Sequence, residues 1–303
     1  MSHWVQRSVA AFAVGLFLAG AAPTAAQELE PRAYRAMPVG LNFVTASYTI
    51  SSGNVVIDAT APVSDLDLHL NSAVVGYLHS FGLFGRSASV SLAAPYVFGS
   101  GSGTVLGVPT EGTRNAWADA RVKLAVNLLG GPAMSPAEFA KRPQGRALGV
   151  GLAIGLPTGQ YGSELIVNFG ANRWAFKPEI GYSGVRGRWI FEAALGVWLF
   201  TSNHDGPGGA TLRQDPIGNV QGHLSYNFDG GVWVSLAANY FTGGQSSIND
   251  EDLPNRQSNS RVGATLSLPL AARHSLKFSA STGAYTRIGA DFDTGTVMYQ
   301  FRW

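Results

Sequence analysis

The sequence has no cysteine, few charged residues and no long apolar run beyond its N-terminal stretch. Of 303 residues, 13% are charged and 46% are hydrophobic. The lack of cysteine excludes disulfides and cysteine-held metal sites, so stability has to come from burial and backbone hydrogen bonds. Since no later apolar run reaches about 18 residues, the sequence also excludes a helical membrane protein of the usual kind.

The first 26 residues are typical of a secretory signal peptide. Arg7 precedes the apolar run SVAAFAVGLFLAGAA, and the small residues Thr24 and Ala26 stand three and one positions before the expected cleavage site. A membrane anchor or a buried helix fits less well because the apolar stretch is short. We therefore predict export and a mature chain of residues 27–303. Removing Arg7 leaves 20 of the 21 basic residues against 19 acidic ones, a balance that indicates no nucleic-acid partner.

Apolar residues recur at every second position through most of the remaining chain. The clearest segment is NAWADARVKLAVNLLG, which has one apolar and one polar face. A period of two over so long a run predicts a β-strand with one face in an apolar environment and one in water. The two faces are Ala118, Ala120, Val122, Leu124, Val126 and Leu128 against Asp119, Arg121, Lys123 and Asn127.

The same alternation predicts twelve strands. Most of the segments have about ten residues or more, the length that a tilted strand needs to cross a bilayer, whereas strands of soluble proteins average about five or six. The predicted strands lie near 38–49, 67–80, 87–98, 114–128, 146–157, 174–183, 188–200, 216–228, 232–242, 259–270, 275–286 and 294–303.

The connections between these strands alternate in length. Short turns (FGLFGR, GVRG, DGG and AARH) alternate with long connections near 50–66, 99–113, 158–173, 201–215, 243–258 and 287–293. Short periplasmic turns and long outer loops are typical of bacterial outer-membrane barrels. We therefore predict an all-β fold, a transmembrane antiparallel β-barrel of about 12 strands in the bacterial outer membrane. A secreted sandwich or jelly roll is the alternative, but its strands would be shorter.

One connection breaks this alternation. Residues 130–145 should form a periplasmic turn, yet the segment is long. Within it, Ser135 and Pro136 are suited to the N-cap and the first position of a short helix.

Several stretches of the second half of the chain carry a family resemblance: PTGQY (157–161), NRWAFKPEIG (172–181), GVWLFT (196–201), QDP (214–216), QGHLSYNF (221–228), NSRVGATLSLPL (259–270), HSLKFSAS (274–281) and TRIGADFDTGTVMYQFRW (286–303). From about residue 146 onward, the sequence resembles the outer-membrane transporter family named after the MetA pathway of phenol degradation. The earlier half resembles it more loosely. The resemblance implies an outer-membrane barrel and uptake of phenol-like or other hydrophobic compounds, and it supplies no catalytic residues.

The polar faces of the predicted strands would point into the barrel lumen. One interpretation is a pore whose charges select the solute, and the other is a narrow interior filled by charge pairs between neighbouring strands. We expect the lumen to be lined by Asp119, Arg121, Lys123, Lys177, Glu179, Glu192, His223, Arg261 and Lys277, with Asp67, His69 and Arg302 on the same face.

Two further patterns concern the lumen. In ALGVGLAIGLP the inward positions are all Gly or Ala, which would line either a passage or a surface against which large neighbours pack. The same phasing points Trp198, Phe241, Trp233 and Tyr285 inward. These rings could receive an aromatic ligand, but a shift of one residue would place them in the aromatic girdle at the membrane interface.

Catalysis and cofactor binding find little support. His223 and Ser225 share one strand, but no sequence around them resembles an outer-membrane phospholipase. The acidic stretches NDEDLPNR (249–256) and GADFD (289–293) read as solvated loops more readily than as sites for divalent cations or lipopolysaccharide. We therefore expect no enzyme activity, no cofactor and no bound metal.

The function predicted from sequence is passive uptake of small, hydrophobic or aromatic compounds across the outer membrane. A structural or adhesion barrel with a plugged lumen is the alternative. The expected partners are outer-membrane lipid, lipopolysaccharide, the barrel-assembly machinery and a small-molecule solute. The resemblance also implies an assembly signal in the last predicted strand, formed by Tyr299, Phe301 and Trp303.

Overall fold

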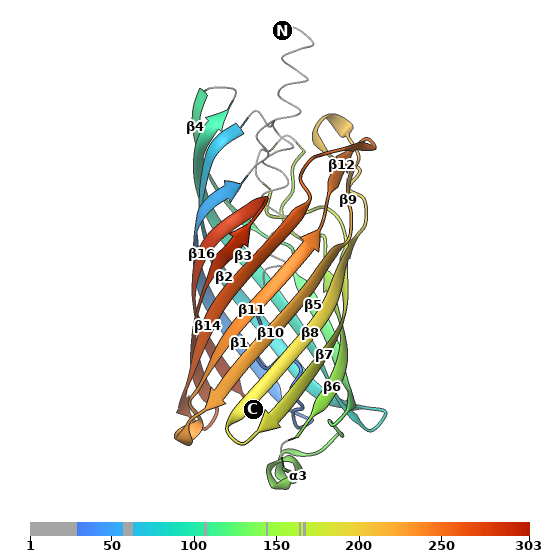
Figure 1. The fold of residues 1–303 in the computed structure, drawn as a ribbon, viewed down its shortest axis with the longest axis vertical. Helices are drawn as coiled ribbons and strands as arrows, with labels where there is room; N and C mark the ends of the chain where they lie inside the picture. Colours follow the sequence, from blue (N-terminus) through green and yellow to red (C-terminus); the bar gives the residue numbers. More distant parts are fainter. Residues whose placement is uncertain (1–28, 57–62, 106–107, 144, 164, 166–167) are drawn as a thin grey trace.

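Twelve strands pair antiparallel in a closed ring, which Figure 1 shows from the side. The computed structural model describes residues 29–56, 63–105, 108–143, 145–163, 165 and 168–303. The predicted signal peptide lies outside the described residues. No helix among the described residues is long and apolar enough to cross a membrane.

The ring confirms the predicted strand number and closes between its first and last strands. β1 pairs with β16 from Phe43 and Arg302 at one end to Val56 and Gly289 at the other. In order around the barrel, the strands are β1 (Asn42–Val56), β2 (Val63–Leu83), β3 (Arg86–Val105), β4 (Val108–Trp117) with β5 (Arg121–Leu129), β6 (Ala147–Gly155), β7 (Ala175–Arg186), β8 (Trp189–Phe200), β10 (Ile217–Asn227), β11 (Trp233–Gly243), β14 (Gln257–Ala271), β15 (His274–Thr286) and β16 (Gly289–Arg302). Closure leaves no unpaired sheet edge in the lipid, where each free backbone group would be costly.

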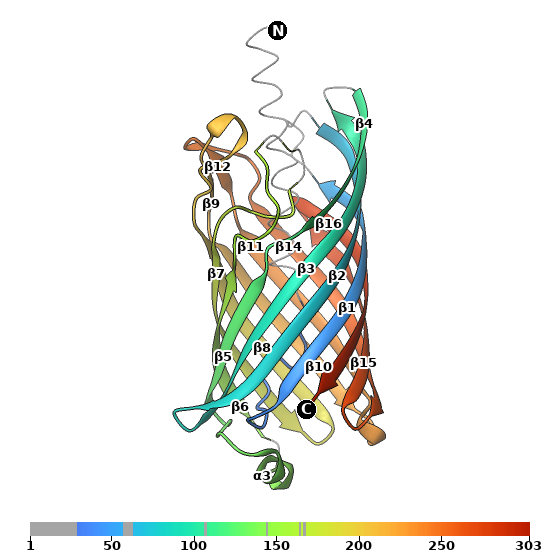
Figure 2. The ribbon, with the colours of Figure 1, turned by 180° about the vertical axis from the view of Figure 1, so that it is seen from behind.

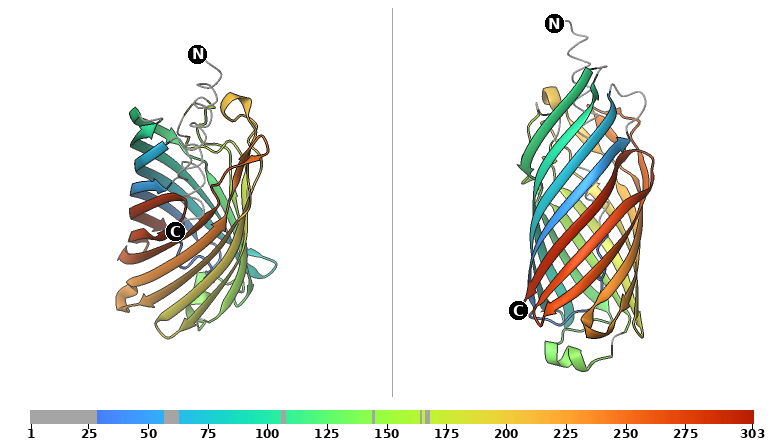
Figure 3. Two further views of the ribbon diagram at one scale, coloured as in Figure 1. Left: turned by 45° about the horizontal axis from the view of Figure 1, so that its top comes forward. Right: turned by 90° about the vertical axis from the view of Figure 1, so that its left-hand side faces the viewer.

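Alternating burial along the strands shows why this sequence forms a membrane barrel. In β8, Phe191, Leu195 and Val197 are exposed on the outside, while Ile190 and Trp198 are buried inside. The exposed apolar side chains form the surface that lipid solvates. The predicted outer-membrane barrel fold is therefore confirmed, and Figure 3 shows the tilt of the strands around the axis.

β4 and β5 are two parts of one barrel strand. Both pair with β3, β4 along residues 96–105 and β5 along residues 88–93. The predicted single strand near 114–128 is interrupted at residues 118–120, where the Asp119 carboxylate accepts hydrogen bonds from the backbone N–H of Gly159 (2.8 Å) and Ala171 (2.8 Å). The interruption fixes the segment after β6 against the wall.

The predicted long loops are correct on one side of the barrel and wrong on the other. Residues 50–66, 99–113 and 287–293 were expected to be loops, yet most of their described residues continue β1, β2, β3, β4 and β16 as strands. Figure 2 shows β3 and β4 rising highest on this side of the barrel. Cross-strand pairing continues past the membrane there because both faces of a strand can be polar in water.

On the opposite side, long loops extend beyond the barrel strands (Figure 1). They hold the short turn η1 (Pro207–Gly209) and a three-stranded sheet of β9 (Leu212–Gln214), β12 (Ser246–Ile248) and β13 (Glu251–Asp252). At the other end, the connections are tight, except the one between β5 and β6, and include η2 (Asp229–Gly231). By the length rule for outer-membrane barrels, this second end is the periplasmic one.

The long periplasmic connection contains the predicted helix, α3 (Pro136–Lys141). Ser135 is its N-cap, and the cap is reciprocal: Glu138 N–H donates to the Ser135 hydroxyl and Ser135 N–H donates to the Glu138 carboxylate. The hydrogen bonds from Ser135 hold the pKa of the Glu138 carboxyl below its ordinary value. In Figure 1, α3 lies outside the barrel, at the end that also holds the C-terminus.

Candidate lumen site

Residues 29–41, called the luminal segment below, run inside the barrel toward its periplasmic end. Glu30 reaches Lys123 on β5 (3.2 Å), and the Tyr34 ring packs directly on Gly181 of β7. Farther along, the carbonyl of Met37 accepts a hydrogen bond from the hydroxyl of Ser87 (2.7 Å). The luminal segment therefore occupies the lower part of the lumen before it joins β1.

Arg32 anchors the luminal segment at its turn. Its backbone N–H donates to the Glu192 carboxylate (2.6 Å), and its guanidinium donates to Asn227 (2.6 Å) and lies 3.9 Å from the Trp233 ring centre. Arg32 also adopts a φ of 69°, a left-handed conformation that is unusual outside glycine. The three wall contacts offset the cost of that conformation.

Lys123 stands at the centre of a charge cluster above this anchor. Its ammonium lies 2.8 Å from Glu179, whose second oxygen is 3.1 Å from Lys177. Glu179 is buried, and it fits because Gly151 leaves room: a Cβ there would lie 3.1 Å from its carboxylate. The cluster joins β5, β7 and the luminal segment through Glu30.

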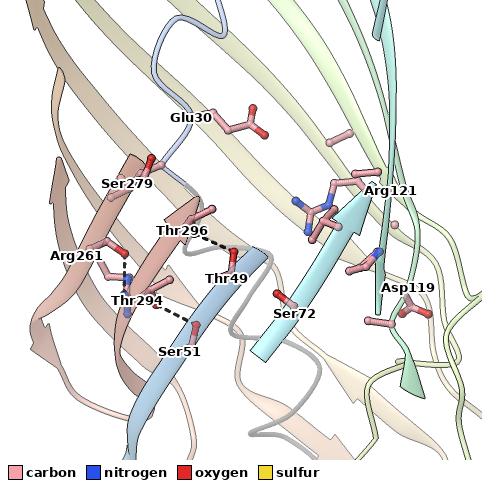
Figure 4. A pocket seen from close by; sticks show the side chains of 18 of the residues that line it. Glu30, Thr49, Ser51, Ser72, Asp119, Arg121, Arg261, Ser279, Thr294 and Thr296 are labelled. Atoms are coloured by element: carbon pink, nitrogen blue, oxygen red, sulfur yellow. Dashed lines mark hydrogen bonds between the residues drawn. The ribbon is translucent and has the colours of Figure 1, made fainter. Parts of the chain in front are cut away.

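Above the luminal segment is a cavity of about 490 Å³, called the upper cavity below, which Figure 4 shows from close by. Leu29 and Glu30 contribute to its lining. One side carries small hydroxyl side chains, some of which bond to each other across strands: Thr49 to Thr296 (2.9 Å) and Thr265 to Ser279 (3.0 Å). We call this side the hydroxyl wall, which consists of Thr49, Ser51, Ser72, Ser91, Thr265, Ser279, Ser281, Thr294 and Thr296.

The other side of the upper cavity is the charged wall, formed by Asp119, Arg121, Lys123, Arg173, Lys177 and Glu179. Aromatic rings stand beside its cations. The Arg121 guanidinium lies 5.6 Å from the Trp198 ring centre, and the Arg173 guanidinium lies 4.6 Å from that of Phe200. This side can therefore contact both the charge and the apolar body of a small molecule.

The structure divides the residues expected in the lumen between two levels. Asp119, Arg121, Lys123, Lys177, Glu179 and Arg261 line the upper cavity. Glu192, His223 and Lys277 lie lower: Glu192 binds Arg32, His223 pairs with Glu192 in the strand register, and Lys277 donates to Gln300 (3.0 Å). Arg302 lies at the periplasmic rim, where it donates to the Ala272 carbonyl (3.0 Å).

Two of the expected inward positions are wrong. Ser72 and Val74 of β2 line the upper cavity, so Asp67 and His69, at the alternate positions, face outward, where their side chains form a pair at 3.3 Å and are 47% and 64% exposed. They lie at the start of the predicted strand 67–80, next to the expected loop 50–66, and there a charged side chain faces water rather than lipid.

Tyr285 is also misplaced in the sequence analysis. It is 60% exposed, because the register of β15 skips Ala284 where Tyr285 pairs with Ser260 and Gly283 with Arg261. This one-residue bulge reverses the facing of every later position on the strand. The other three rings, Trp198, Phe241 and Trp233, are buried inside as expected.

The small inward residues of β6 lie against larger neighbours. Ala153 packs in a buried cluster with Trp198, Ile217 and Phe241, next to Phe200. Ala153 and Gly155 also line the upper cavity, so the small positions of β6 both pack against large neighbours and border open space. Elsewhere in the lumen, the Ser225 hydroxyl donates to Ser235 (3.0 Å) on the next strand, so its recorded partner is another hydroxyl rather than His223.

The sequence analysis missed the luminal segment. Its residues have no regular period and lie between the predicted signal peptide and the first strand. A signal was present, because three ionisable side chains, Glu30, Arg32 and Arg35, interrupt an otherwise apolar approach to β1. It also missed Arg173, which lies between predicted strands and donates to Gln214 beneath the outer loops.

Comparison with known proteins places this barrel in a family. The family model described as "Putative MetA-pathway of phenol degradation" matches residues 45–296. The chain belongs to this family. The match includes the first half of the barrel, where the resemblance of the sequence was looser.

Solved structures share the fold. An outer membrane channel from Pseudomonas putida F1 is 20% identical, with a TM-score of 0.78 over 91% of this chain and 100% of that one. The transport unit of the autotransporter AIDA-I from Escherichia coli is 9% identical, with a TM-score of 0.54 over 98% of both chains. No curated protein matches the sequence.

Proposed function

We propose that the barrel carries small, hydrophobic or aromatic compounds passively across the bacterial outer membrane. The observation that carries the proposal is the upper cavity, a space of about 490 Å³ inside the barrel with aromatic rings and small side chains in its lining. A space of this size takes a small organic molecule. Membership in a family named after phenol degradation and likeness to an outer membrane channel support the same role.

In this proposal, residues 1–26 are a cleaved signal peptide and residues 27–303 form the outer-membrane barrel. The solute moves down its gradient, and no catalytic step is involved. Lipid and lipopolysaccharide surround the barrel, and the barrel-assembly machinery inserts it, reading Tyr299, Phe301 and Trp303 of β16. These rings lie at the periplasmic end, where the Phe301 and Trp303 ring centres are 5.5 Å apart and the backbones of Trp303 and Asn42 exchange two hydrogen bonds.

Passage through the barrel requires the luminal segment to move. The segment is held by polar and ionic contacts at Glu30 and Arg32 and by the ring of Tyr34, and each such contact contributes only on the order of 1–3 kcal/mol. Thermal motion or a bound solute can therefore displace the luminal segment.

The test is uptake of a labelled neutral aromatic compound, such as phenol, by porin-deficient Escherichia coli that expresses the protein. We expect faster uptake than in cells that carry an empty vector, and faster uptake than in cells that hold an equal amount of another folded barrel. If the protein is folded in the outer membrane and uptake still equals that of the control cells, the proposal is contradicted.

A barrel with a structural or adhesive role and a permanently closed lumen is the second candidate. The luminal segment favours it, because Arg32 and Tyr34 fill the lower lumen. The two candidates differ in conductance: planar-bilayer recordings show no current at any voltage for a permanently closed lumen, and intermittent current for a segment that moves.

A further inference from the structure

The charges that line the upper cavity do not balance. Among the described residues in its lining, five side chains are cationic and three are carboxylates. Charges at membrane depth are costly unless something compensates them. The two sets are Arg121, Lys123, Arg173, Lys177 and Arg261 against Glu30, Asp119 and Glu179.

The three carboxylates are already engaged. Glu179 forms ion pairs with both Lys123 (2.8 Å) and Lys177 (3.1 Å), and Glu30 forms a second ion pair with Lys123 (3.2 Å). Asp119 accepts two backbone N–H groups, at 2.8 Å each. The lining therefore keeps more cationic than acidic side chains, and the carboxylates of Asp291 and Asp293, outside the lining, also act on Arg261.

Arg261 has N–H groups that donate no hydrogen bond to any described residue. The residue is 3% exposed, and its Nη2 donates to the Phe292 carbonyl (2.6 Å) and to the Ser281 hydroxyl (3.1 Å). Its Nε and Nη1 have no hydrogen-bond partner within the described part of the chain. A buried donor without a partner is unfavourable, and either of these N–H groups can donate a charge-assisted hydrogen bond to a carboxylate oxygen.

Figure 4 shows Arg261 and Arg121 on opposite sides of the cavity. Arg121 lies over Trp198, and the rings of Phe169, Phe200 and Phe292 also line the cavity. A ligand that fits this arrangement has one negative group, which compensates the arginines, and a flat apolar body, which contacts the rings.

We propose that the upper cavity binds an aromatic monocarboxylate, whose carboxylate accepts a hydrogen bond from Arg261 and whose ring lies against the aromatic rings of the lining. The proposal rests on the proposed uptake function and names the class of solute that the cavity holds best. The excess of positive charge attracts the anion, and the rings select an aromatic body over a simple inorganic ion.

The experiment is isothermal titration of the purified, folded full-length protein in detergent at pH 7.5, with benzoate and with benzyl alcohol. The two probes share a ring and differ in charge. We expect benzoate to bind at least about tenfold more tightly, since a charge-assisted hydrogen bond contributes about 1.5–3 kcal/mol. Arg261→Gln should remove this preference and leave benzyl alcohol binding unchanged.

Two further variants serve as a control and as an alternative to Arg261→Gln. Arg213→Gln changes an exposed arginine that pairs with Asp250 in the outer loops, and it should bind benzoate like the wild type. If Arg261→Gln does not fold, Arg121→Gln tests the same positive charge from the opposite wall, and it should weaken benzoate binding selectively.

Equal affinities for benzoate and benzyl alcohol would overturn the carboxylate proposal and leave the proposed uptake function intact. Benzoate binding that Arg261→Gln and Arg121→Gln leave unchanged would also overturn it. Binding of neither probe would do the same, and phenol uptake by cells then decides the uptake function separately, because phenol is neutral at that pH.

Discussion

The hydroxyl wall and the charged wall face each other across one cavity, yet they are built by different means. The hydroxyl wall is regular sheet, from β14 through β16 and β1 to β3, and its side chains bond to their neighbours across strands. The charged wall includes an interrupted strand, two residues outside strands and a shared carboxylate. Short hydroxyls satisfy each other locally, whereas long charged side chains depend on distant partners, so the charged wall should be the more vulnerable of the two.

The largest effect should follow from removing the shared carboxylate of the charged wall. Glu179→Gln leaves Lys123 with Glu30 alone and Lys177 with no acidic partner among its recorded contacts. We expect a loss of about 3 kcal/mol in the free energy of unfolding, because the cations stay buried while their compensation is removed. Urea unfolding of the protein in detergent micelles, followed by tryptophan fluorescence, measures it. A loss below about 1 kcal/mol would show that the charged wall is no more fragile than a surface ion pair.

The next effect concerns the seam that closes the hydroxyl wall. Deleting Trp303 removes the backbone hydrogen bonds to Asn42 and the ring contacts with Phe301 and Tyr77. We expect severalfold less protein in the outer membrane, with unchanged conductance of the molecules that do assemble. Quantitative immunoblots of outer-membrane fractions measure the level. A wild-type level would contradict the role of this aromatic end in assembly.

A smaller effect should come from loosening the luminal segment between the two walls. Arg32→Ala removes the contacts with Asn227 and Trp233 and keeps the backbone hydrogen bond to Glu192. We expect the fraction of time spent in the conducting state to rise about two- to tenfold, as the loss of one hydrogen bond and one cation–π contact implies. Single-channel recording measures it, and Arg188→Ala, an exposed turn residue that pairs with Asp229, is the matched control. The same open fraction in both variants would contradict the anchoring role.

The smallest effect is expected in the hydroxyl wall itself. Thr296→Val breaks one cross-strand hydroxyl pair, and Thr49→Val combined with it removes both partners. We expect about 1 kcal/mol or less for the single change and still less for the pair, because no donor is then left without an acceptor. The same urea series as for Glu179→Gln tests this. A loss as large as that of Glu179→Gln would remove the contrast between the walls.

The barrel was predictable from sequence because its physical requirements repeat along the chain. Lipid outside and polar groups inside impose a period of two, which marks the twelve strands, and the capping residues Ser135 and Pro136 mark α3 by themselves. The inward placement of Lys123, Glu179 and Arg261 follows from the same alternation.

The remaining features could not be predicted from the period-two alternation of the strands. The bulge that turns Tyr285 outward is one skipped residue, and nothing in the local pattern identifies it. Asp67 and His69 lie where the strand has left the lipid, so polarity no longer indicates the inner face. The luminal segment has no period at all, and only its contacts with distant strands, such as that of Arg32 with Asn227, define its place.

The most direct test of this account uses the absence of cysteine. In a chain with none, Tyr34→Cys combined with Gly181→Cys introduces a single possible disulfide, at a point where the ring of Tyr34 now lies against the backbone of β7. If solute passes through the lumen when the luminal segment moves, the oxidised protein should take up no labelled phenol beyond background in porin-deficient cells, and reduction should restore uptake. Equal uptake by the oxidised and reduced protein would contradict passage through the lumen.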